Sequence, residues 1–240
     1  LLVLSQYPIK RLISLVPPVS VSPDSSLSWM LDEMNRRLFG SQGAFVVNEK
    51  GLDSHALNLA LEARQAEGVP TLLFATTLAA AALLETNLNC LLPEGSLILT
   101  TGGAKRDGGS INPANVDSLL AQRFAADIGS EYGMTELLSQ AYRLPRTNLH
   151  GQFQLPPWCR VLAIDPHTGA PISSAASQAS PQGERGGLLR FIDLANAQTR
   201  IAVQTADLGI TFGPHRFTFL GRAPGVRTRG CSLTFDELTS

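Results

Sequence analysis

Cysteine is scarce in this 240-residue chain, and its scarcity excludes both a disulfide-stabilised scaffold and a cysteine-based zinc site. The three cysteines, Cys90, Cys159 and Cys231, are too few and too far apart to form a disulfide framework or a zinc site. This usage is typical of a reducing compartment such as the cytoplasm, where one cysteine could act as a working thiol. The four histidines show no metal-ligand spacing, so we expect no zinc.

The chain also lacks an excess of charge and a long uninterrupted hydrophobic run. Nineteen basic and 20 acidic residues give a net charge of −1, which is no reason to expect nucleic acid or an anionic membrane surface as a partner. The apolar start of the chain is broken by Pro8, Lys10 and Arg11, so it is too short to span a bilayer. The length predicts one large domain or two small ones.

The first half contains a regular alternation of short apolar runs and helical patterns. The apolar runs predict buried strands at residues 11–16, 44–47, 71–75 and 96–100. The helical patterns predict helices at about residues 25–39, 53–68, 76–85 and 113–128, the last of them stopped by Gly129. The expected caps are Ser22 or Asp24 for the first helix and Asp53 for the second, and Asn112 is expected to open the fourth. Strands too apolar to face water, alternating with helices, are typical of a mainly parallel sheet that helices cover. The stretch SEYGMTE is therefore expected directly after a helix.

The second half has short strand patterns at close spacing, separated by turn sequences such as DPHTG and FGPH. These strands are predicted at residues 160–164, 187–192, 199–204 and 215–221. The predicted fold class is α/β, with a mainly parallel sheet and flanking helices followed by a smaller antiparallel β subdomain. The predicted division is an α/β part at residues 1–150, a β-rich subdomain at 151–225, and a C-terminal segment at 226–240 that carries Cys231.

A glycine-rich loop directly follows the fourth predicted strand. Gly102 and Gly103 could let a ligand approach the backbone closely, and Lys105 could meet a phosphate; an ordinary turn is the alternative. Ligand sites in open α/β sheets lie beyond the carboxyl ends of the strands. This loop and the SEYGMTE loop could therefore line one cleft.

The stretch EYGMTE combines groups that suit a nucleotide. Tyr132 could stack on a flat base, Thr135 could bond a phosphate oxygen, and Glu136 could hold Mg²⁺. The alternative is a turn in which Glu136 begins a helix. Asp207, in TADLG, is expected in a turn between strands, where it could bond its own backbone or clasp two ribose hydroxyls.

Cys231 is the candidate nucleophile. A free cysteine is more often a small buried hydrophobe, and we interpret Cys90 and Cys159, in apolar surroundings, in that way. Cys231 instead follows Arg222, Arg227 and Arg229. Nearby cations lower the pKa of a thiol and favour the nucleophilic thiolate.

Taken together and in this order, these stretches resemble the superfamily of adenylate-forming enzymes, and within it most closely the LuxE acyl-protein synthetases. The features shared with LuxE are TGGAK, QLPPW followed by AIDPHTGAP, TADLG, and RGCSL near the end of the chain. The resemblance covers essentially the whole chain. It implies that ATP and Mg²⁺ serve to activate a fatty acid as an acyl-adenylate. The acyl group would then pass to an enzyme cysteine and finally to an acceptor protein.

The resemblance also implies a role for each candidate residue. The implied nucleotide-binding residues are Gly102, Gly103, Lys105, Tyr132, Gly133, Thr135, Asp207 and Arg222. Tyr132 would stack against adenine, and Asp207 would bond the ribose. Thr135 would bond the α-phosphate, and Glu136 would help to hold Mg²⁺. Cys231 would carry the acyl group as a thioester.

Two features of the family pattern are not found in this sequence. The first is an upstream phosphate loop of the TSGTTG type, and the second is a C-terminal lid domain with its lysine. The chain therefore resembles an N-terminally truncated member, and the missing lid favours LuxE over a CoA ligase. Two alternatives stay open: a carboxylate–CoA ligase of the phenylacetate type, and a non-catalytic nucleotide-binding or docking fragment.

Overall fold

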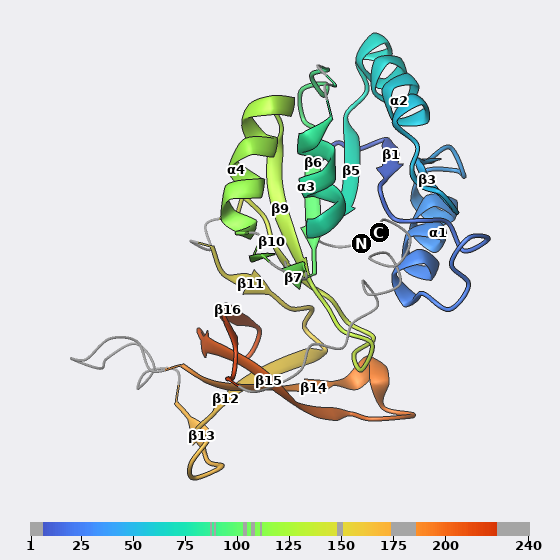
Figure 1. The fold of residues 1–240 in the computed structure, drawn as a ribbon. Helices are drawn as coiled ribbons and strands as arrows, with labels where there is room; N and C mark the ends of the chain where they lie inside the picture. The colour runs from blue at the N-terminus through green and yellow to red at the C-terminus, as the bar shows by residue number, and fades with distance from the viewer. Residues whose placement is uncertain are drawn as a thin grey trace. The chain divides into compact units, whose positions relative to one another are not determined.

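The chain folds into two compact units. The structure is a computed structural model that describes residues 7–102 except 87 and 89, 105–106, 109–110, 112–147, 151–173 and 186–224. Of these described residues, those up to Glu131 form the first unit and those from Tyr132 onward form the second (Figure 1). No helix in the described part of the chain is long and apolar enough to cross a membrane.

The first unit is built on a parallel sheet. Its strands, in spatial order, are β9 (Asp127–Tyr132), β6 (Leu97–Thr101), β5 (Thr71–Thr76), β1 (Arg11–Ser14) and β2 (Ala44–Phe45). Every residue of β5 and β6 is buried, as expected for central strands covered on both faces. Two short antiparallel hairpins accompany the sheet: β3 (Val47–Asn48) with β4 (Gly51–Leu52), and β7 (Lys105–Arg106) with β8 (Gly109–Ser110).

Four helices connect these strands. They are α1 (Ser26–Leu38), α2 (Ser54–Glu67), α3 (Thr77–Glu85) and α4 (Pro113–Phe124); α3 and α4 pack against each other (Figure 1). The predicted N-caps Asp53 and Asn112 are confirmed, because each side chain accepts a hydrogen bond from the first turn of its helix. The prediction of Ser22 or Asp24 as the cap of α1 is wrong: the cap is Ser25, whose hydroxyl accepts from the Ser28 backbone N–H.

The prediction that the last helix continues to Ile128 is wrong. α4 ends at Phe124 because Ala125 adopts a left-handed conformation with φ of 49°. The next residues then form β9, which pairs in parallel with β6 from Leu97↔Asp127 to Thr101↔Glu131. Gly129 and Ser130 favour a helix only weakly, and β6 supplies the hydrogen bonds that hold them as a strand. SEYGMTE therefore overlaps and follows a strand, not a helix.

The second unit is antiparallel, as predicted. Its strands, in spatial order, are β10 (Ala141–Arg143), β11 (Phe153–Gln154), β16 (Arg216–Arg222), β15 (Ala202–Thr211), β14 (Gly187–Asp193), β12 (Cys159–Ile164) and β13 (Pro171–Ile172). A short 3₁₀ helix, η2 (Leu194–Asn196), follows β14. The core of this second unit contains Leu155, Val161, Leu189, Phe191 and Phe217. The predicted α/β class, with a parallel sheet followed by a smaller antiparallel unit, is confirmed.

The prediction that Asp207 lies in a turn is also wrong. β15 continues to Thr211, and Asp207 pairs with Arg222 of β16. Cross-strand pairing therefore holds the TADLG sequence extended, although it contains Asp and Gly, which are depleted in strands. A register shift follows directly after Leu208.

Candidate functional site

The carboxyl ends of β6 and β9 lie next to each other in the first unit. Thr101 and Glu131, which are register partners there, form a hydrogen bond from the threonine hydroxyl to the carboxyl group. Glu131 is buried, and this burial raises the pKa of its carboxyl group to about 7, against the opposing effect of the hydrogen bond from Thr101. Sequence reasoning did not single out Glu131, because its burial depends on a neighbouring strand 30 residues earlier.

Gly102 begins the loop after β6. Its φ is 82°, and no atom lies within 4 Å of where a Cβ would stand, so the backbone conformation, and not a close contact, requires glycine here. The Thr77 hydroxyl donates to the Gly102 carbonyl at 2.9 Å. Gly103 and the side chain of Lys105 lie outside the described residues, and their predicted roles stay predictions.

Tyr132, Asp207 and Arg222 meet in the second unit. The Tyr132 hydroxyl donates to Oδ2 of Asp207 at 2.7 Å, and Nε of Arg222 donates to Oδ1 at 2.9 Å. Asp207 is only 4% exposed, so these two bonds compensate a buried carboxylate. The structure thus brings together three of the residues that the sequence resemblance selected, although 75 positions separate Tyr132 from Asp207.

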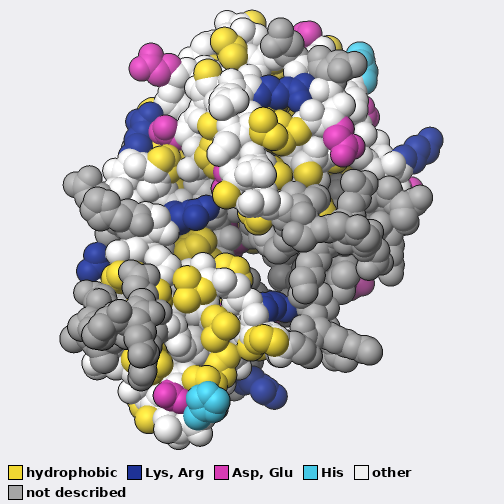
Figure 2. Space-filling model, turned by 60° about the vertical axis from the view of Figure 1, so that its left-hand side comes forward, with side chains coloured by type: hydrophobic (Ala, Val, Ile, Leu, Met, Phe, Trp, Pro, Cys, Tyr) yellow, Lys and Arg dark blue, Asp and Glu magenta, His cyan; other side chains and the backbone are white. Residues whose placement is uncertain are grey.

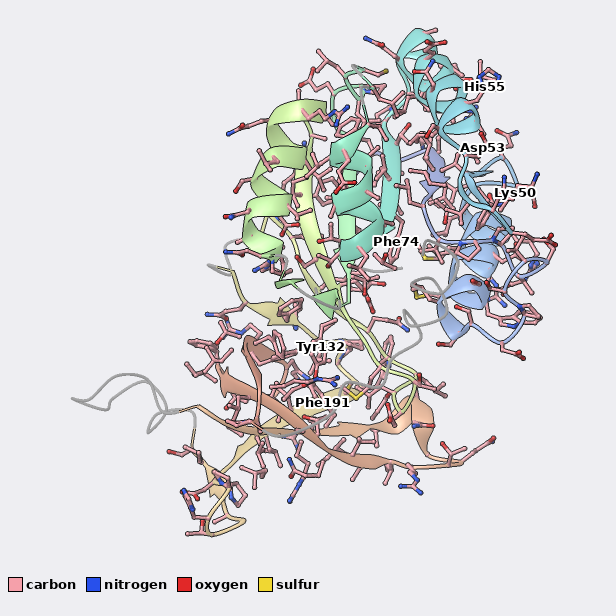
Figure 3. All side chains as sticks on the ribbon, in the orientation of Figure 1. Lys50, Asp53, His55, Phe74, Tyr132 and Phe191 are labelled. Atoms are coloured by element: carbon pink, nitrogen blue, oxygen red, sulfur yellow. The ribbon has the colours of Figure 1, made fainter. Side chains whose placement is uncertain are left out.

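The ring of Tyr132 belongs to an aromatic cluster. Its centroid lies 5.1–5.8 Å from the rings of Phe153, Phe191, Phe217 and Phe219; Figure 3 labels Tyr132 and Phe191, which lie close together in this unit. Phe191 and Phe217 are fully buried, whereas Phe219 is 43% exposed and Tyr132 is partly exposed. The cluster therefore reaches the surface at Tyr132 and Phe219. On the face drawn in Figure 2, apolar side chains are exposed among charged ones.

The loop after Tyr132 carries Thr135 and Glu136. Both residues are exposed, as is Gly133. The loop turns through a hydrogen bond from the Leu137 N–H to the Met134 carbonyl at 3.1 Å and contains no helix, so the alternative in which Glu136 begins a helix is not observed. Within the described ranges, no group of three or more His, Cys, Asp or Glu residues is arranged to hold a metal ion by itself.

A buried carboxylate that sequence reasoning missed anchors this loop. Asp193, at the end of β14, is fully buried and accepts hydrogen bonds from the Leu138 and Ser139 N–H groups, at 3.0 and 2.9 Å, and from the Ser139 hydroxyl, at 2.8 Å. The Trp158 indole N–H donates to the Ser139 hydroxyl at 3.0 Å. An aspartate at a strand end gives no local signal of such partners, because they lie 54 and 55 positions away.

Two of the three cysteines are buried in the cores, as the sequence predicted. Cys90 is 4% exposed, and burial raises the pKa of its thiol. Cys159 is fully buried, and burial, followed by the charge of Asp193, raises its pKa to about 12. Neither thiol is poised for nucleophilic chemistry at neutral pH. Cys231 lies outside the described residues.

Comparison with known proteins identifies the fold. No family model and no curated protein matches the chain. A luciferase-like enzyme from the nonluminescent mealworm Zophobas morio is 15% identical with a TM-score of 0.61, and the match covers 93% of this chain and 52% of that one. MatB from Rhodopseudomonas palustris is 16% identical with a TM-score of 0.59, covering 93% and 43%.

O-succinylbenzoate coenzyme A synthetase from Bacillus subtilis, solved with AMP, is 17% identical with a TM-score of 0.56, covering 92% of this chain and 43% of that one. The chain therefore spans about half of these structures or less. At these identities the similarity concerns the fold alone, which this chain shares with a part of each of these three structures.

Proposed function

We propose that this chain is part of an enzyme that uses ATP to activate a carboxylic acid, a fatty acid in the first instance. It would carry the acyl group on Cys231 and pass it to another protein. The observation that carries the proposal is the hydrogen-bonded cluster of Tyr132, Asp207 and Arg222, the residues to which the resemblance assigns the nucleotide. The fold supports it, since a similar structure was solved with AMP and also with ATP and magnesium.

The chemistry of this cluster fits the adenosine part of ATP. A flat base can stack on the partly exposed rings of Tyr132 and Phe219. Each oxygen of Asp207 accepts one hydrogen bond from the protein and has a second lone pair that can accept from a ribose hydroxyl. The Arg222 side chain is 39% exposed, and its guanidinium has further N–H groups to offer the nucleotide.

The loop after Tyr132 fits the phosphates. Thr135 and Glu136 are exposed, and a hydroxyl can donate to the α-phosphate while a carboxylate is the type of oxygen ligand that Mg²⁺ prefers. A bound Mg²⁺ supplies positive charge to the phosphate oxygens. Gly102, Gly103, Lys105 and Gly133 would complete the nucleotide site by resemblance alone.

The proposed reaction has two steps. An oxygen of the substrate carboxylate attacks the α-phosphorus of ATP, the bond to the bridging oxygen breaks, and acyl-adenylate and pyrophosphate form. The protein contributes here by holding the reactants in line and neutralising charge. The Cys231 thiolate then attacks the acyl carbon, and AMP leaves with the electron pair of the broken C–O bond. A thiol of the acceptor protein would take the acyl group by the same exchange.

Preformed acyl-adenylates test the second step directly. The chain is incubated with acyl-adenylates of several lengths, and its intact mass is recorded before and after hydroxylamine. We expect an adduct of one acyl group that hydroxylamine removes, that is lost in Cys231→Ser, and that persists in the matched control Cys90→Ser. An adduct that survives in Cys231→Ser would refute the assignment of the acyl carrier.

A carboxylate–CoA ligase is the second candidate, favoured by the similarity to O-succinylbenzoate coenzyme A synthetase. It differs in its acceptor, because CoA and not an enzyme cysteine would attack the acyl-adenylate. Acyl-CoA formed by Cys231→Ser from acyl-adenylate and CoA would support the ligase. A CoA-independent adduct on Cys231 would support the acyl-protein synthetase.

A further inference from the structure

Asp193 is bonded mainly to the loop that carries Thr135 and Glu136, and less to its own segment. Among the described residues its carboxylate accepts four hydrogen bonds: three come from Leu138 and Ser139, and one comes from the Ala195 N–H at 3.1 Å. A fully buried carboxylate is costly to leave without donors. The loop therefore has a strong energetic preference for the one conformation that brings residues 138 and 139 to Asp193.

The segment after Asp193 holds the loop at a second point. Nδ2 of Asn196 donates to the backbone carbonyl of Glu136 at 2.8 Å, and the Thr199 hydroxyl donates to Oδ1 of Asn196. Asn196 is buried at 6% exposure. The backbone of Glu136 is thus bonded directly, although its side chain is exposed.

Trp158 joins the same cluster from the other side of Ser139. The Ser139 hydroxyl accepts from the Trp158 indole and donates to Asp193, and the Trp158 carbonyl accepts from the Leu194 N–H at 3.1 Å. Trp158 is 43% exposed. Three segments that are distant in sequence therefore converge on one buried hydroxyl–carboxylate pair.

We propose that Asp193 and Ser139 are positioning residues, which fix the loop so that Thr135 and Glu136 face the triphosphate and its Mg²⁺. This inference rests on the proposed function, because it assigns the two exposed side chains to the phosphate end of ATP. The inference predicts that a change at Asp193 weakens binding of the phosphates. Binding of the adenosine, which depends on Tyr132 and Asp207, should stay unchanged.

Asp193→Asn is the sharpest variant. Each carboxylate oxygen of Asp193 faces two donors, so an amide NH₂ in either orientation points at donor groups and cannot restore the cluster. Ser139→Ala removes the hydroxyl alone. Asp165→Asn is the matched control, because Asp165 also accepts from two backbone N–H groups, those of His167 and Thr168, but in an exposed turn.

The test measures dissociation constants of the 240-residue chain for adenosine and for ATP with Mg²⁺ by calorimetry. We expect Asp193→Asn and Ser139→Ala to weaken binding of ATP with Mg²⁺ about tenfold or more, since a small misplacement of binding groups is costly. Binding of adenosine should stay within about twofold, as should both constants in Asp165→Asn. A loss of adenosine binding equal to that of ATP would indicate a general structural role and overturn the proposal.

Trp158 provides an independent readout of the loop. In a Trp29→Phe background it is the remaining tryptophan, and we expect Asp193→Asn to increase quenching of its fluorescence by iodide. Unchanged quenching together with unchanged ATP binding would also overturn the inference. If the unmodified chain binds neither adenosine nor ATP, the proposed function fails and the inference fails with it. If the chain binds adenosine and ATP, and Asp193→Asn does not change ATP binding, the inference alone is refuted.

Discussion

Glu131 is a residue whose environment makes its ionisation matter near neutral pH. Burial raises the pKa of its carboxyl group to about 7, against an ordinary value of 4.5. A raised carboxyl pKa means that the folded state holds the proton more tightly than the unfolded state does. The resulting stabilisation is complete below pH 4.5 and is lost as the pH rises through 7.

The first prediction concerns Glu131→Gln, a variant whose side chain cannot ionise. Between about pH 5 and pH 7.5 the free energy of unfolding should fall by roughly 2 kcal/mol through Glu131, and Glu131→Gln, which stays neutral, should lose this component. Urea unfolding of both proteins at the two pH values measures the difference. Parallel pH dependences in the two proteins would show that Glu131 does not titrate in this range.

The Tyr132 hydroxyl leads to the second prediction. Tyr132→Phe removes a donor to the buried Asp207 carboxylate and should destabilise the protein by about 1.5–3 kcal/mol, the range for hydrogen bonds to charged groups. In an Asp207→Ala background the same change should cost much less, because its partner is gone. Equal costs in the two backgrounds, measured by denaturant unfolding, would mean that the two side chains are not coupled.

At the scale of single elements, the starts of α2 and α4 follow from local sequence, whereas the strand β9 does not. Asp53 and Asn112 were identified as caps because a cap bonds the N–H groups two or three residues away. β9 was missed because its residues become a strand only by pairing with β6, 30 residues earlier. Asp207 was assigned to a turn for the same reason, and the partners of Asp193 lie too far away in sequence to be inferred.

The cap of α1 supplies the third prediction. Ser25 accepts a hydrogen bond from the first turn of the helix, whereas the neighbouring Asp24 is exposed. Ser25→Ala should lower the free energy of unfolding by about 1 kcal/mol, and Asp24→Ala by a few tenths through the helix dipole alone. Thermal unfolding measures the stability of both variants. A larger loss of stability in Asp24→Ala than in Ser25→Ala would mean that Asp24, and not Ser25, caps the helix.

At the scale of the whole molecule, the two units can be followed separately. Trp29 belongs to α1 in the first unit, and Trp158 belongs to the second. All three members of the Tyr132–Asp207–Arg222 cluster are in the second unit. A ligand that binds this cluster therefore stabilises the second unit directly.

The fourth prediction uses the two tryptophans as separate probes. At a concentration 100 times its dissociation constant, adenosine should stabilise the unit to which it binds by about 2.7 kcal/mol. We expect the denaturant midpoint reported by Trp158, in Trp29→Phe, to rise by that free energy divided by the m-value of the transition. The midpoint reported by Trp29, in Trp158→Phe, should shift less. Identical shifts would show that the two units unfold as one.

The burial of Cys90 and Cys159 has a practical consequence for labelling. Alkylating reagents such as maleimides attack thiolates that they can reach, and these two sulfurs are both buried and disfavoured as thiolates. Any rapid, stoichiometric modification of the folded chain would therefore occur at Cys231, without removal of the other cysteines. A single fluorophore or spin label introduced in this way would therefore mark the sulfur on which the proposed chemistry depends.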